Sequence, residues 1–113
     1  MAERAAKDSL FAAFASVAKA LGNGHRAEIV DVLAQGERSV DELAAEIGQS
    51  VANTSQHLQV LAQAGLVQSR RAGTRVIYRP ASEGVLDLWM AVRSVAVEHV
   101  ASVELLADRK SVV

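Results

Sequence analysis

Hydrophobic residues recur at helical spacing in the first part of the chain. Between residues 5 and 21 they are separated by three or four positions, which predicts a first helix over this range. The residues with this spacing are Leu10, Phe14, Val17 and Leu21. The Gly-Asn-Gly triplet at 22–24 ends that helix, and a second, shorter helix is predicted from Arg26 to Ala34.

Two more short helices are predicted within residues 39–65. Ser39 and Glu42 have the spacing of a capping box, in which the serine oxygen accepts a backbone N–H and the glutamate reaches back, so a third helix begins there. It ends at Gly48, and Gln49 and Ser50 open a fourth helix that Gly65 terminates. The inward positions of the fourth helix are expected to be Thr54, Leu58 and Leu61, with Ala62 alongside.

The pattern changes to alternation in twos over residues 66–80, around a glycine, which predicts a β-hairpin. Pro80 closes its second strand, because proline cannot donate to a continuing ladder. From 83 to 107 the spacing is helical again, with an apolar stripe wider than one small domain needs. The sequence therefore predicts one domain over 1–113, mainly α, with five helices and one β-hairpin.

Composition narrows the class of protein. The 113 residues suit a single domain, and no apolar run approaches the roughly 20 residues of a membrane-spanning helix. The charged residues Glu3, Arg4, Lys7 and Asp8 leave no room for a secretion signal, so we expect a cytoplasmic protein without a membrane partner. The absence of cysteine excludes disulfides, thiolate metal sites and cysteine nucleophiles.

The charge is unevenly distributed along a chain whose formal net charge is only -1. No Asp or Glu occurs from Ile47 to Ser82, and acidic residues return on either side of this segment. The segment contains Arg70, Arg71, Arg75 and Arg79. One face of a nearly neutral protein is therefore expected to be cationic, as nucleic-acid binding requires.

The fourth helix has small or amide-bearing residues at its outward positions. They are Ser50, Ala52, Asn53, Ser55, Gln56 and Gln59. Asn and Gln amides can pair with adenine edges, and serine hydroxyls can serve a base or a phosphate, whereas acidic side chains there would repel the DNA backbone. The alternative is a polar helix that merely faces solvent.

The arginines of the hairpin favour the DNA interpretation. A turn near Ala72 and Gly73 is expected to bring the guanidinium groups of Arg70, Arg71 and Arg75 to one end, with Thr74 in the turn, where they can bind phosphates. The alternative is a charged edge strand that only prevents aggregation.

Taken together, the segments 26–33, 39–44, 54–61 and 64–79 resemble the ArsR/SmtB family of bacterial repressors, and the resemblance covers almost the whole chain. It implies a winged helix-turn-helix protein that forms a homodimer through its first and last helices, over 5–21 and 83–107. It also implies a helix-turn-helix over 39–65, a wing over 66–80, binding to double-stranded operator DNA, and release by an effector that is often a metal ion.

The chain departs from the family at the metal sites. Residues 39–43 lack the Cys-x-Cys pair that many members carry, which excludes thiolate sensing of arsenic or cadmium. The last helix keeps only part of the other known ligand pattern. The candidate ligands are His99, Asp87, Glu98 and Glu104. Duplicated by two-fold symmetry they would suit Ni²⁺ or Zn²⁺. The alternative is a hydrogen-bonded interface histidine.

Two other functional classes differ in how well the sequence fits them. A winged-helix module that binds another protein, without specific DNA binding, is the main alternative. An enzyme is not expected, because the sequence has no paired carboxylates, nucleophile triad or phosphate-binding glycine loop.

Overall fold

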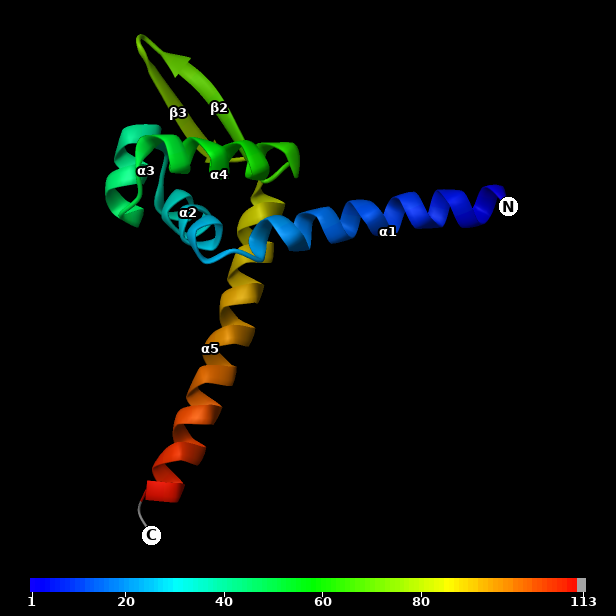
Figure 1. Cartoon of the computed structure of the whole chain (residues 1–113), viewed down its shortest axis with the longest axis vertical. Helices are drawn as coiled ribbons and strands as arrows, with labels where there is room; N and C mark the ends of the chain where they lie inside the picture. Colours follow the sequence, from blue (N-terminus) through cyan, green and yellow to red (C-terminus); the bar gives the residue numbers. More distant parts are fainter. Residues whose placement is uncertain (112–113) are drawn as a thin grey trace. The chain divides into compact units, whose positions relative to one another are not determined.

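The computed structural model describes residues 1–111, with side chains through Glu104. Within these residues the elements in chain order are α1 (Ala2–Leu21), α2 (Gly24–Gln35), β1 (Arg38–Ser39), α3 (Val40–Ile47), α4 (Val51–Gln63), β2 (Val67–Ala72), β3 (Arg75–Pro80) and α5 (Glu83–Ser111) (Figure 1). The chain divides into two compact units, residues 1–82 and the segment from Glu83 onward, and each is described by itself.

The first two helices are longer than the sequence predicted. α1 begins at Ala2, not at residue 5, since no glycine or proline interrupts the first turns and Arg4 pairs with Asp8 one turn later at 3.1 Å. α2 begins at Gly24 and runs to Gln35 because Asn23 caps it: the Asn23 side chain accepts a hydrogen bond from the Arg26 backbone N–H at 3.1 Å.

The capping box that begins α3 is confirmed. Ser39 Oγ accepts the Glu42 backbone N–H at 3.2 Å, and the Glu42 carboxylate accepts the Ser39 backbone N–H at 3.1 Å. α3 ends at Gly48, which adopts the left-handed conformation (φ 67°) that favours glycine. The turn into α4 is therefore fixed at both ends by local sequence.

The core of the first unit lies among α2, α3, α4 and the start of the hairpin. Its buried apolar residues are Ile29, Val30, Leu33, Leu43, Ala44, Ile47, Leu58, Leu61, Leu66 and Val67, with Ala20 from α1. As predicted, α4 turns Thr54, Leu58 and Leu61 inward. Ala62 was expected beside them and is instead exposed.

The hairpin is present as predicted, but it belongs to a three-stranded antiparallel sheet in the order β1-β3-β2. The sequence did not predict β1, in which Arg38 pairs with Tyr78 and Ser39 with Ile77. Two residues are too few for an alternating pattern, so this strand carries no sequence signal. In Figure 1 β2 and β3 project away from the three helices of the core.

Several large apolar side chains of α1 are exposed. Leu10, Phe11 and Phe14 are each more than half exposed, and the rings of Phe11 and Phe14 meet edge to face with centroids 5.4 Å apart. Only Ala20 of this helix is buried.

α5 begins at Glu83 as predicted and runs to Ser111, beyond the expected end at 107. Val85 and Trp89 are its buried residues among those described. Its exposed large apolar residues are Leu88, Met90, Val92, Val95, Val97, Val100 and Val103. Despite this apolar character, no helix in the described residues is long and apolar enough to cross a membrane.

Candidate nucleic-acid interface

The exposed face of α4 carries the side chains that the sequence predicted to face outward. Ala52, Asn53, Gln56 and Gln59 are exposed and Ser55 is half-buried. The amides of Asn53, Gln56 and Gln59 make no hydrogen bond within the described residues. Their donors and acceptors are therefore available to a ligand without breaking an internal bond.

Ser50 has a structural role that limits what its side chain can offer. Its Oγ accepts the Asn53 backbone N–H at 3.0 Å and caps α4. Its carbonyl accepts the hydroxyl of the buried Thr54 at 2.8 Å. Ser50 lies on the predicted outward face, but its side chain is already engaged as the N-cap of α4.

The wing, defined as β2, β3 and the turn at Gly73 and Thr74, has two distinct faces. Arg70 lies opposite Ile77 and Ala72 opposite Arg75, while Arg71 lies opposite Val76. Because side chains alternate along a strand, Arg70 and Arg75 share one face and Arg71 lies on the other. All three arginines lie beside the turn, at one end of the hairpin as expected, but on its two faces, and their contact with phosphates stays a prediction.

Both arginines on the shared face are paired with acidic residues from outside the wing. Arg70 Nη2 lies 2.7 Å from the Glu37 carboxylate. Arg75 Nη2 lies 2.6 Å from the Glu42 carboxylate and donates to Ser39 Oγ at 3.0 Å. No local sequence pattern predicts these pairs, because both acids precede the acid-free segment.

Several groups stabilise the negative charge of the Glu42 carboxylate. The backbone N–H and the hydroxyl of Ser39 lower the pKa of the Glu42 carboxyl below its usual 4.5, and Arg75 lowers it further. A single carboxylate therefore serves both the cap of α3 and the wing.

The other polar groups of the wing differ in their contacts. Arg71 and Thr74 are exposed and make no polar side-chain contact within the described residues. Arg79 donates to the side-chain oxygen of Gln68 at 3.1 Å. Among the wing arginines, Arg71 is thus the one whose guanidinium can bind a phosphate without giving up an internal partner.

A contact between α2 and α4 was not predicted from sequence. The imidazole rings of His25 and His57 lie 5.6 Å apart, and Arg26 Nη1 approaches His57 Nδ1 at 3.5 Å. Burial lowers the pKa of the His57 imidazole below its usual 6.5, and the charges of Arg26 and His25 lower it further. Arg26 also donates from Nε to the Ala20 carbonyl at 2.6 Å and so links three helices.

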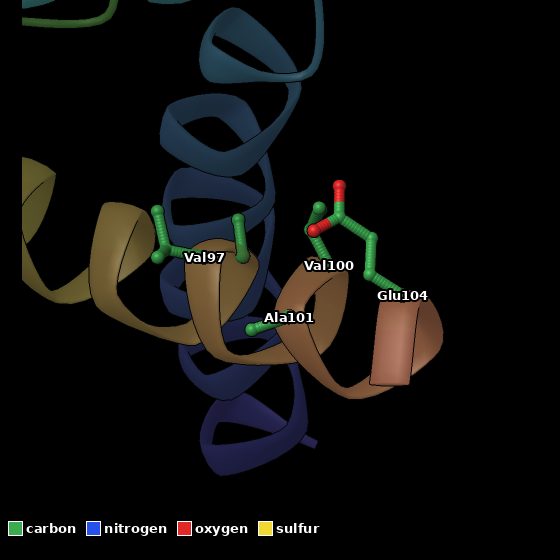
Figure 2. Close-up of a pocket in the computed structure, with 5 residues that line it drawn as sticks. Val97, Val100, Ala101 and Glu104 are labelled. Carbon is green, nitrogen blue, oxygen red and sulfur yellow. The ribbon is translucent and has the colours of Figure 1, made fainter. Parts of the chain in front are cut away.

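The predicted metal ligands all lie on α5 and are exposed, and His99 lies on an apolar face of this helix beside Val92, Val95 and Ala96. A neighbouring apolar patch of the same helix is formed by Ala96, Val97, Val100 and Ala101, with Glu104 at its end (Figure 2). Among the described residues, no three His, Asp or Glu side chains come together as a metal site would require.

The chain is similar to known bacterial regulators. The sequence profile of the family described as "Bacterial regulatory protein, arsR family" matches residues 23–69. The HTH-type transcriptional regulator Rv0324 of Mycobacterium tuberculosis is 46% identical over 101 residues, which cover 89% of this chain and 45% of that protein. The chain spans about half the length of Rv0324 and of KmtR from the same organism, 45% and 55% respectively.

Solved structures agree with this similarity. The solution structure of the homodimeric winged helix-turn-helix DNA-binding domain Mb0332 from Mycobacterium bovis has a TM-score of 0.79 and 47% identity, covering 82% of this chain and 86% of that one. The crystal structure of M. tuberculosis Rv0081 has a TM-score of 0.76 and 33% identity, covering 82% and 94%. The predicted winged helix-turn-helix fold is confirmed.

Proposed function

The chain belongs to the arsR family of bacterial regulatory proteins, and on this basis we propose that it binds operator DNA sequence-specifically as a homodimer. Its relatives are transcription regulators, not enzymes, in agreement with the class expected from the sequence. One observation carries the proposal: α4 has no acidic residue and exposes the unbonded side-chain amides of Asn53, Gln56 and Gln59, directly before an arginine-bearing wing.

In the proposed complex α4 enters the major groove. Gln56 and Asn53 read base edges there, because amides pair bidentately with adenine. Ala52 and Ser55 are small enough to allow close approach of the helix, and Gln59 extends the polar face by one turn. The wing then contacts phosphates through Arg71 and Thr74, and through Arg70 and Arg75 once their internal pairs exchange.

The proposed partner of the chain is a second copy of itself. Leu10, Phe11 and Phe14 on α1 and the exposed valines of α5 are apolar surfaces that a homodimer would remove from water. The related Mb0332 domain is described as homodimeric. As a regulator of chromosomal operators, the dimer would act in the cytoplasm.

We propose Ni²⁺ or Zn²⁺ as the effector only if the metal site is shared between the two copies of the dimer. Asp87 and His99 are about 18 Å apart along α5 at about 1.5 Å per residue, so one chain cannot bring them to a single ion. A site would therefore combine His99 of one copy with Asp87 of the other, with Glu98 and Glu104 as the further candidate ligands. Titration of Ni²⁺ and Zn²⁺ into the protein by calorimetry, repeated with His99→Ala, tests this; no binding at micromolar metal ends the metal version and leaves DNA binding intact.

Selection of duplexes from a random library tests the main proposal. We expect one sequence motif with two-fold symmetry to be enriched, because a dimer presents α4 twice. Arg71→Ala should weaken binding to every duplex and reduce the slope of log K against log salt by about 0.9 per chain. If no duplex binds even at low salt, DNA binding is excluded and a protein-interaction module becomes the better interpretation.

A further inference from the structure

Two of the wing arginines have their charge neutralised by residues of the same chain. Glu37, just before β1, holds Arg70, and Glu42, in the first turn of α3, holds Arg75, at 2.7 and 2.6 Å. The arginine side chains are 55% and 56% exposed, and the glutamates 42% and 50%. Both pairs are therefore open to solvent and to a competing anion.

Phosphate is a natural competitor for these guanidinium groups. A guanidinium binds carboxylate and phosphate oxygens with the same planar arrangement of N–H donors. Exposed ion pairs are weak, so exchange of a carboxylate for a phosphate costs little. The exchange nevertheless has a consequence, because the displaced carboxylate stays near the phosphate and repels it.

We propose that Glu37 and Glu42 are specificity-determining residues that lower the affinity of the wing for nonspecific DNA. The inference rests on the proposed function. On a nonspecific duplex only phosphate contacts are available, and the two acids cancel much of what Arg70 and Arg75 would add. On an operator, base contacts from α4 hold the wing against the DNA backbone, and phosphates then replace the two carboxylates at Arg70 and Arg75.

The geometry allows this role to be separated from folding. Glutamine can replace glutamate at the third position of a capping box, so Glu42→Gln keeps the bond to the Ser39 backbone N–H and removes only the charge. Glu37 has no capping role, and Glu37→Gln provides a second, independent variant. Asp41 lies beside Glu42 in the same turn and has no arginine partner among the described residues, so Asp41→Asn is the matched control.

The experiment measures the affinity of the full chain for a labelled duplex of scrambled sequence and for the duplex selected by the wild-type protein. Fluorescence anisotropy is recorded over about 50 to 200 mM salt, the range over which phosphate contacts change affinity most visibly. We expect Glu42→Gln and Glu37→Gln to raise affinity for the scrambled duplex about three- to tenfold, with a steeper salt slope. Affinity for the selected duplex should rise less, so discrimination falls.

The controls decide the interpretation. Asp41→Asn should change nonspecific affinity less than about twofold, and Glu42→Gln should lose its effect when combined with Arg75→Ala. Equal effects of all three charge removals, or unchanged affinity in both glutamine variants while the wild-type protein binds duplexes normally, would overturn the inference and leave the proposed function standing. Failure of every variant and of the wild type to bind any duplex would overturn both.

Discussion

On α4 the exposed amides of Asn53, Gln56 and Gln59 are free of internal hydrogen bonds in the described residues, whereas on the wing the guanidinium groups of Arg70 and Arg75 are each held by a carboxylate. Groups that read bases must present an unchanging pattern of donors and acceptors. Groups that bind phosphate act through charge, which neighbours can adjust. The proposed interface therefore combines a fixed hydrogen-bonding pattern on α4 with a charge on the wing that neighbouring carboxylates adjust.

The largest expected effect separates the two faces of α4 itself. Leu58 is fully buried, so Leu58→Ala should lower the free energy of unfolding by about 2 to 5 kcal/mol. Replacing Gln59, the exposed neighbour of Leu58, by alanine should change the free energy of unfolding by less than about 0.5 kcal/mol. Urea unfolding followed by circular dichroism measures both, and a similar loss in the two variants would mean that the exposed face of α4 is not free.

A second experiment contrasts base reading with charge. Gln56→Ala should reduce discrimination between the selected duplex and single-base variants of it at one position by about 1 to 3 kcal/mol. Arg71→Ala should weaken all duplexes alike. Gln63→Ala, at the C-terminal end of the same helix, is the matched control. Competition anisotropy against a panel of duplexes provides the measurement, and uniform weakening by Gln56→Ala would contradict base contact at that residue.

The two serine caps sharpen the comparison further. Ser39→Ala and Ser50→Ala each remove a side-chain acceptor at the start of a helix, and each should lower stability by about 1 kcal/mol. Only Ser39 also accepts from Arg75, so Ser39→Ala should change nonspecific DNA affinity, and this change should disappear when Arg75→Ala is added. Thermal unfolding and anisotropy on the same samples test this, and an undiminished effect of Ser39→Ala in the Arg75→Ala background would argue against a link between the α3 cap and the wing.

The smallest expected effect is the loss of stability at acidic pH. Because the pKa of His57 is lowered in the folded protein, the unfolded chain takes up a proton at a higher pH than the folded one. The neutral imidazole of His57 therefore contributes to the stability of the folded protein above about pH 6.5. This contribution is lost as the pH falls from there through the lower pKa that His57 has in the folded protein. Tm should fall less between about pH 8 and pH 5 in His57→Asn than in the wild type. His99→Asn, on α5, is the control; an identical pH profile in both variants would refute this role of His57.

Much of the fold was predictable because its signals are local. The cap at Ser39, the glycine at 48 and the proline at 80 each fix an element within a few residues, and the structure places those boundaries where the pattern indicated. β1 was missed because two residues carry no periodicity. The start of α1 was missed because its first turn has no side-chain cap to mark it.

The site was predictable in composition but not in its contacts. Residues 47–82 contain no acid, which predicted a cationic face, yet Glu37 and Glu42 from outside this segment pair with Arg70 and Arg75. The approach of His57 to Arg26 likewise joins residues 31 positions apart. Such contacts depend on how elements pack, and no local pattern of residue types records them. The predicted DNA contacts and metal ligands remain predictions.

The corner between α1 and α2 has a mechanical consequence. Two glycines within residues 22–24 would leave this joint free to swivel. Arg26 bridges it: Nε and Nη2 donate to the carbonyls of Ala20 and Lys19 at the end of α1, and Nη1 lies 3.5 Å from His57 Nδ1 on α4. One guanidinium therefore adds to the direct packing of α1 on α2 and α4, so a displacement at the end of α1 would be passed on to the helix proposed to read the bases.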